Sequence, residues 1–300
     1  MRALGKALLW AWAVAGICSG GWAWAGCWQR LPEVPRRISL CGEPVPLHLP
    51  WVAEALDREV VISAYDRAQV VMWIKRAARY FPYISSRLRA RGLPEDLKYL
   101  AVAESSLLTH IRSPAGAVGP WQFLASTAKR YGLVVNKWVD ERRDLERATE
   151  AALTYLTDLR EEFGSWTLAM AAYNCGERRL RREILEQGLT DYYHLYLPKE
   201  TRRYIFRILA AKIILSHPGR YGYCVPARGL YKPLNYERVE LHLRRKMHIL
   251  RLARAAGTTF MRIKLLNPWL VDYYIPRGQW IVRVPVGSAK RLRRRLKIRR

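Results

Sequence analysis

The chain has 300 residues, half of them apolar, which excludes an intrinsically disordered protein and allows a sizeable buried core. Lys and Arg number 52 against 25 Asp and Glu, so the formal net charge is +27. Such a charge predicts anionic partners: nucleic acid, an anionic membrane surface, or a polymer that carries carboxylates or phosphates. The charge alone does not choose among these classes.

The N-terminal residues have the three-part layout of a secretory signal, which we assign to residues 1–26. Two basic residues precede an uncharged apolar run over residues 7–25, and small residues follow. Two processing routes are open, because residues 23–25 form an A-x-A cleavage site, whereas WAGC, ending at Cys27, resembles a bacterial lipoprotein box. An uncleaved anchor helix is the third alternative, since the run approaches the ~20 residues that span a bilayer. The sequence predicts an exported, periplasmic protein, with or without a lipid anchor.

The five cysteines show no Cys-x-x-Cys motif and no zinc-like pairing with His, so no metal site is predicted. One of them, Cys18, leaves with the signal. The other four can form one or two disulfides in an oxidising compartment or stay as buried free thiols, and both alternatives are open.

One helical domain is predicted over residues 66–220, after an irregular, proline-rich lead-in over residues 27–65. Helical periodicity begins at Trp51 and continues through the domain. No strand is expected before residue 235. Clustered Pro and Gly indicate a linker over residues 221–236.

The C-terminal part has a different pattern, a β-α-α-β unit over residues 237–286. Residues 239–243 alternate as in a strand, and a short amphipathic helix closes at Gly257. A second helix runs to Leu266, and a final strand follows. The segment 287–300 is expected to be a basic amphipathic or disordered arm, with a solubilising tail that has no dedicated partner as the alternative.

One acidic residue, Glu104, interrupts an apolar run. On a helix over residues 94–108, Glu104 shares one face with Leu97 and Leu100, at the spacing of a buried stripe. Burying a carboxylate is costly unless it is paired or neutralised, and desolvation raises its pKa, which suits a general acid. This geometry alone also allows a structural ion pair with a nearby arginine.

Three further motifs follow Glu104 along the chain. The loop RSPAGAVGPWQF combines glycines with an aromatic ring and an amide, which suits a sugar, although glycine loops also merely turn chains. In AMAAYNCG, Tyr173 and Asn174 interrupt an apolar helix, and core packing of the tyrosine is the alternative. In LPKETRRYIFRILAAK, Glu200 opens a helix that contains Tyr204, and helix capping explains this glutamate equally well.

Together and in this order, the four motifs resemble the catalytic domain of the lytic murein transglycosylases. AESSLL resembles the family's E-S motif, SPAGAVGPWQFLASTAKRYGL its G-x-x-G-x-W-Q loop, AAYNCG its A-Y-N-x-G motif, and LPKETRRYIFRILAAK its E-T-x-x-Y helix. One departure is Leu124-Ala125, where the family commonly has Met-Pro, and we expect it to change only the shape of the cleft. The resemblance implies a mainly α, lysozyme-like fold of the goose-type and soluble lytic transglycosylase kind.

Carried over residue by residue, the resemblance implies that Glu104 is the catalytic acid and base. It implies substrate-binding roles for Ser105, Ser113, Gln122, Tyr173, Asn174, Glu200 and Tyr204. The implied reaction cleaves the bond between N-acetylmuramic acid and N-acetylglucosamine without water, because the C6 hydroxyl of the muramic acid closes a 1,6-anhydro ring. The family chemistry needs neither a metal nor an organic cofactor.

The unit over residues 237–286 is similar to a LysM module, which binds N-acetylglucosamine polymers. Its Asn267-Pro268 step and its closing strand follow the module, whereas the usual Gly-Asp-Thr is absent near Lys246. Glycan binding and a degenerate, structural module are therefore both open.

The expected partners are peptidoglycan strands and, through the basic tail, an anionic membrane or wall polymer. A hydrolytic muramidase on the same scaffold and a catalytically silent glycan-binding scaffold are the competing functions. A nucleic-acid partner is not expected, because the chain carries an export signal and no recognisable nucleic-acid motif. The sequence makes no prediction of oligomeric state.

Overall fold

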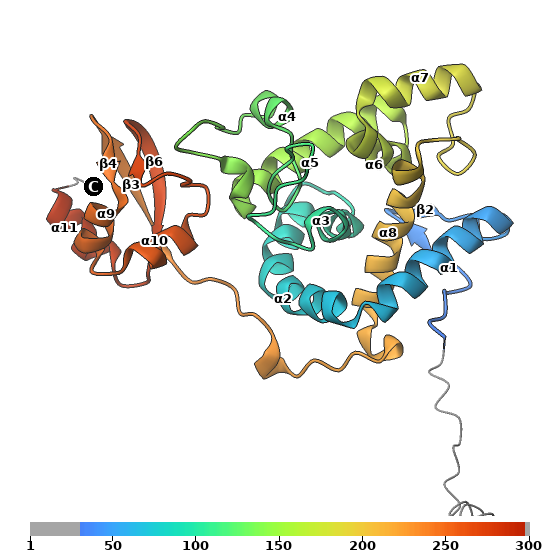
Figure 1. The fold of residues 1–300 in the computed structure, drawn as a ribbon, viewed down its shortest axis with the longest axis horizontal. Coiled ribbons are helices and arrows are strands. Elements are labelled where there is room, and N and C mark those ends of the chain that lie inside the picture. The colour runs from blue at the N-terminus through green and yellow to red at the C-terminus, as the bar shows by residue number, and fades with distance from the viewer. Residues whose placement is uncertain (1–30, 298–300) are drawn as a thin grey trace, which may run out of the picture. The chain divides into compact units, whose positions relative to one another are not determined.

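The computed structural model describes residues 31–297, and across them the prediction of a mainly α-helical protein is confirmed (Figure 1). The helices are α1 (Pro50–Tyr65), α2 (Arg67–Ala90), α3 (Lys98–Ser105), α4 (Ala125–Arg130), α5 (Leu145–Phe163), α6 (Trp166–Cys175), α7 (Glu177–Gln187), α8 (Lys199–Ser216), α9 (Ile249–Ala256), α10 (Phe260–Leu266) and α11 (Ala289–Leu296). The strands are β1 (Ser39–Leu40), β2 (Glu43–Pro44), β3 (Glu237–Leu243), β4 (Met247–His248), β5 (Tyr274–Ile275) and β6 (Gly278–Val284). Short 3-10 turns occur at Glu95–Leu97, Glu141–Arg143, Pro218–Tyr221 and Ala227–Gly229.

The helical domain is assembled around α3, which packs against α2 and α8 (Figure 1). The long helix α5 packs against α2 and α6, and α1 packs along α8. Leu100, Leu156 and Ile208 come from three different helices and are all fully buried in one core. Each such aliphatic side chain stabilises the fold by about 1.5–3 kcal/mol, so α3 is held firmly on both sides.

Helix α3 is shorter than the predicted helix over residues 94–108. A 3-10 turn precedes it, and it ends at Ser105 because the next two residues have positive φ, 52° at Ser106 and 61° at Leu107. Non-glycine residues rarely adopt this conformation, so contacts must hold it in place. Trp73 of α2 supplies one, since its indole nitrogen donates to the Ser106 hydroxyl at 2.9 Å.

The N-terminal lead-in is more ordered than predicted. Strands β1 and β2 pair in antiparallel fashion, which corrects the expectation of no strand before residue 235. Cys41 and Gly42 between them both have positive φ, as a two-residue hairpin turn requires. Helix α1 agrees with the helical periodicity predicted from Trp51, although the expected domain boundary left it in the lead-in over residues 27–65; Pro50 starts it, and its contact with α8 makes it part of the helical core.

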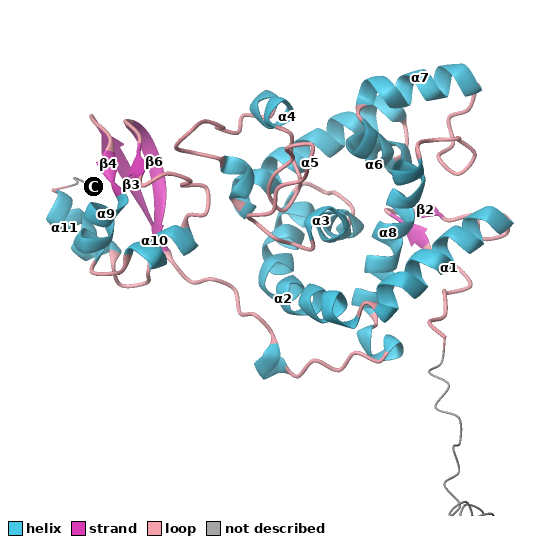
Figure 2. Ribbon diagram, in the orientation of Figure 1, coloured by secondary structure: helices cyan, strands magenta, loops and turns pink. Residues whose placement is uncertain are grey.

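The expected β-α-α-β order is observed in the C-terminal unit, which holds most of the strand structure (Figure 2). Strands β3 and β6 are antiparallel, with Val239 opposite Val282, and a short pair, β4 and β5, accompanies α9 and α10. The basic segment adopts the amphipathic alternative over residues 289–296. There Leu292 of α11 is fully buried, so this helix packs onto the unit through α9 and β3.

Three cysteines lie in the described part of the chain, and Cys41, Cys175 and Cys224 are all free thiols. Cys18, Cys27 and the predicted export signal lie outside the described residues. Within residues 31–297 no helix is both long enough and apolar enough to cross a membrane. The same residues contain no group of three or more His, Cys, Asp or Glu arranged to hold a metal ion.

Candidate active site

Glu104 lies on the last turn of α3, facing α8. The hydroxyl of Tyr204, a residue that is 1% exposed, donates a hydrogen bond to its Oε1. Arg207, one turn further along α8, donates to the carbonyl oxygen of Ala103 at 2.8 Å, which holds a positive charge near the carboxyl group. The carboxyl therefore has one hydrogen-bond donor and one nearby cation.

This environment gives Glu104 an unusual acidity. Burial raises the pKa of its carboxyl from 4.5 to about 7; the hydrogen bond from Tyr204 and the charge of Arg207 oppose this rise, and the nearby Glu200 adds to it. A carboxyl group with a pKa near 7 can be present in either protonation state at neutral pH. That property suits a group that first gives and then takes a proton.

Tyr173 of α6 lies close enough to Glu104 for the charge of that carboxyl to affect it. Burial and then the charge of Glu104 raise its pKa well above the usual value. Its hydroxyl donates to the carbonyl oxygen of Trp121 at 2.6 Å, while the indole nitrogen of the fully buried Trp121 donates to Thr149 at 3.0 Å. Tyr173 thus links the glutamate site to the glycine-containing loop.

The loop over residues 111–123 depends on its glycines. Gly119 has a φ of 88°, and a Cβ at this position would overlap the carbonyl oxygen of Arg142, so only glycine fits. The side-chain amide of Gln122 donates to the Gly119 carbonyl oxygen at 2.9 Å, and the Ser113 hydroxyl accepts from the Ala117 amide at 3.0 Å. The polar groups of Gln122 and Ser113 therefore bond within the loop.

The remaining predicted site residues connect the elements around Glu104. The buried Ser105 hydroxyl lies 2.9 Å from the Pro120 carbonyl oxygen, so it ties the end of α3 to the loop. Asn174 accepts from the Thr201 hydroxyl at 2.9 Å, which joins α6 to α8, and the neighbouring Glu200 is exposed. The structure thus brings Tyr173, Tyr204 and Glu200 near Glu104, while Ser105 and Asn174 bond neighbouring elements to one another.

Sequence reasoning missed two residues at this site. Arg207 follows Tyr204 by three positions and so lies on the same helix face, which is a signal the sequence did contain. Arg142 had no such signal. Its guanidinium donates to the carbonyl oxygens of Gly116 at 3.2 Å and Phe123 at 3.1 Å and thereby holds the loop over residues 111–123.

Residues 82–195 match the Transglycosylase SLT domain, so this part of the chain belongs to that family of domains. It is similar to membrane-bound lytic murein transglycosylase D of Escherichia coli (strain K12), with 33% identity over 227 residues that cover 74% of this chain and 49% of that protein. It is also 35% identical over 117 residues to a putative tributyltin chloride resistance protein of Alteromonas sp., a match that covers 38% of this chain and 56% of that protein. The chain spans about half the length of these relatives.

Two solved structures are similar to part of the chain. The 70-kDa soluble lytic transglycosylase of Escherichia coli has a TM-score of 0.39 at 20% identity, covering 52% of this chain and 27% of that one. The lytic transglycosylase Slt of Pseudomonas aeruginosa has a TM-score of 0.36 at 19% identity, covering 51% and 26%. At these TM-scores the likeness assigns neither residues nor an activity.

Proposed function

We propose that this chain is a peptidoglycan lytic transglycosylase. Its substrate is the β-1,4 bond from N-acetylmuramic acid to N-acetylglucosamine, and its product carries a 1,6-anhydro ring. The observation that carries this proposal is the enclosed Glu104 carboxyl, whose pKa near 7 fits one group that acts as acid and then as base. The match to the Transglycosylase SLT domain and the similarity to a lytic murein transglycosylase support the same reaction.

In the first step the protonated Glu104 donates its proton to the glycosidic oxygen, and the bond from that oxygen to C1 of the muramic acid breaks. Most glycosidases use a second carboxylate at this point. Here the 2-acetamido carbonyl of the substrate supports the positive charge that develops at C1. One protein carboxyl group is therefore enough.

In the second step the Glu104 carboxylate takes the proton of the C6 hydroxyl, and that oxygen bonds to C1. Glu104 ends the cycle protonated, and no water is consumed. Between the two steps the ionised form is stabilised by the hydrogen bond from Tyr204 and by the charge of Arg207. We assign Tyr204 and Arg207 to the control of this proton.

The other predicted site residues have two kinds of role in this proposal. The charge of Glu104 raises the pKa of Tyr173, and the exposed Glu200 raises the pKa of Glu104, so both residues lie near this carboxyl and we assign them to contacts with the sugar. We assign Asn174 to the same role, because its hydrogen bond from Thr201 joins it to the residue of α8 that follows Glu200. Ser105, by contrast, is buried against backbone carbonyls, and we assign it to holding the loop that Ser113 and Gln122 shape.

The location and the further partners are part of the proposal. The name of the Escherichia coli relative describes a membrane-bound protein, and an export signal with a lipid anchor at Cys27 would give this chain a similar place at the periplasmic membrane surface. The net charge of +27 and the basic face of α11 favour contact with anionic lipid or wall polymers. Mass analysis of the mature N-terminus tests the anchor.

Identification of the products tests the reaction. Purified peptidoglycan is digested with the wild type and with Glu104→Gln, and the released muropeptides are analysed by mass spectrometry. Anhydro products from the wild type alone support the proposal. Products heavier by one water identify a hydrolytic muramidase, and a wild type that binds the peptidoglycan but releases no products identifies a glycan-binding scaffold.

A further inference from the structure

A segment between α4 and α5 joins the core of the C-terminal unit. We call residues 138–144 the bridging segment. Its Val139 is fully buried among the side chains of the C-terminal unit and pairs with Leu270 in an antiparallel bridge. The amide of Asp140 donates to the carbonyl oxygen of Trp269 at 2.8 Å. The bridging segment therefore belongs to the helical domain by sequence and to the C-terminal unit by packing.

A buried ion pair strengthens this junction. Both terminal nitrogens of Arg283 donate to the carboxylate of Asp144, at 2.5 and 2.9 Å, and Asp144 is fully buried. Asp144 is also the N-cap of α5, since it accepts from the backbone amides of the first turn. One arginine of strand β6 thus fixes the point at which the bridging segment becomes α5.

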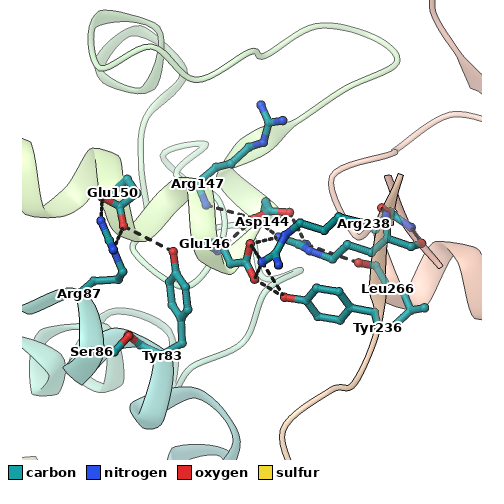
Figure 3. Close-up of polar contacts among 12 residues, drawn as sticks. Tyr83, Ser86, Arg87, Asp144, Glu146, Arg147, Glu150, Tyr236, Arg238 and Leu266 are labelled. Carbon is teal, nitrogen blue, oxygen red and sulfur yellow. Dashed lines mark hydrogen bonds and ion pairs between the residues drawn. The ribbon is translucent and has the colours of Figure 1, made fainter. Parts of the chain in front are cut away.

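More exposed groups surround that pair. Figure 3 shows Tyr236 and Arg238 pointing toward Glu146, which lies beside Asp144 at the start of α5. Arg238 donates to Glu146 at 2.8 Å but does not bond to Asp144, and its side chain is 54% exposed. Arg238 therefore offers a matched control for Arg283: the same charge and the same strand pair, without the bond to the bridging segment.

The other side of the bridging segment supports the glycine-containing loop. Arg142 is held by Asp140 through two bonds of 2.8 Å, and both residues are 6% exposed. From this fixed position Arg142 donates to the carbonyl oxygens of Gly116 and Phe123. Its own carbonyl oxygen lies against Gly119. Two successive contacts therefore connect the C-terminal unit to the loop beside Glu104.

We propose that the C-terminal unit is a positioning element for the active-site loop. Arg283 and the Trp269–Leu270 backbone hold the bridging segment, and Arg142 transmits that position to the loop. If Arg283 loses its charge, the buried carboxylate of Asp144 is left without its cation, and an unpaired buried charge is strongly destabilising. Movement of the bridging segment is the easiest way to bring Asp144 back into contact with water. The effect on the reaction rests on the proposed function, whereas the effect on the loop does not.

The first test measures the loop directly in the full-length chain. The amides of Val118 and Phe123 bond to each other's carbonyl oxygens across the loop, so their hydrogen exchange reports whether it is held. We expect Arg283→Gln to raise exchange at these two amides about tenfold relative to the amides of α8, and Arg238→Gln to leave it within about twofold. Arg283→Lys should restore part of the protection.

A second variant reaches the same junction without changing any charge. Val139→Ala removes packing inside the C-terminal unit, and we expect it to loosen the same two loop amides. Unchanged exchange in both Arg283→Gln and Val139→Ala would overturn the proposal. So would an equal rise at every amide, because that indicates general destabilisation.

Activity gives the second readout, on a soluble peptidoglycan oligomer. A loop displaced by about 1 Å should lower kcat of Arg283→Gln by between about tenfold and a hundredfold, with a smaller change in KM. Unchanged kcat despite raised loop exchange would overturn the catalytic part of the inference. If the wild type itself releases no product, the proposed function fails, and the exchange experiment still decides whether the C-terminal unit positions the loop.

Discussion

The hydroxyl of Tyr204 on α8 donates a hydrogen bond to the carboxyl of Glu104 on α3, which lies 100 residues earlier in the chain. Two opposing effects meet in this contact: burial favours the protonated carboxyl, and the hydrogen bond favours the carboxylate. Burial is the larger effect, and the pKa therefore settles near 7. The reaction proposed for Glu104 depends on this balance, and each effect can be altered separately.

Replacing the carboxyl group removes proton transfer while it keeps the shape of the site. In Glu104→Gln the amide oxygen can still accept the hydrogen bond from Tyr204, so we expect normal folding. We expect peptidoglycan cleavage to fall by a factor of about 10²–10⁴, the usual contribution of a general acid or base. Muropeptide release and circular dichroism check the two expectations, with Glu161→Gln, a change at an exposed glutamate of α5, as the control. Full activity in Glu104→Gln would contradict the assignment.

Removing the hydrogen bond should shift the pH dependence upward. Tyr204→Phe deletes a group that lowers the pKa of Glu104, so that pKa should rise above 7. The first step needs the protonated carboxyl, and the high-pH limb of kcat/KM should therefore move to higher pH. Tyr99→Phe is the matched control, because Tyr99 bonds to Ser216 instead of Glu104. A limb that stays in place or moves to lower pH counts against the role of Tyr204.

The raised pKa of Glu104 also affects folding stability. The folded pKa of about 7 exceeds the unfolded value of 4.5, so the folded state binds more protons between these values. Stability from this group therefore falls as the pH rises from about 4.5 to 7, by at most about 3 kcal/mol. Glu104→Gln should lack this decline. Urea unfolding of both proteins at pH 5 and pH 8 measures it, and equal pH dependence in the two would contradict the raised pKa.

The sequence supported the prediction of Glu104 because an isolated carboxylate in an apolar stripe is a local signal, and the motif order placed Tyr173 and Tyr204 near it. The end of α3 was not predictable, since the positive φ of Leu107 depends on distant contacts such as that of Trp73 with the same turn. The role of Arg142 was hidden for a related reason. From the sequence alone, a buried arginine cannot be distinguished from a surface arginine, because its partners are distant in the chain.

The loop gives a test of close packing that does not depend on any ionisable group. Gly119 and Gly116 both have positive φ, 88° and 84°, so alanine at either position costs backbone strain of about 1 kcal/mol or more. Only at Gly119 would the new Cβ also overlap a backbone atom, the carbonyl oxygen of Arg142; at Gly116 the nearest atom is 3.9 Å away.

We therefore expect Gly119→Ala to lower the free energy of unfolding by about 1–3 kcal/mol more than Gly116→Ala, because the extra overlap must push the loop away from the bridging segment. Urea unfolding measures this difference. Cleavage should fall in the same order, since Gly119→Ala displaces the loop backbone that Arg142 supports. Equal losses in the two variants would mean that the loop can move freely against the bridging segment. In that case the support from Arg142 would not hold the loop beside Glu104.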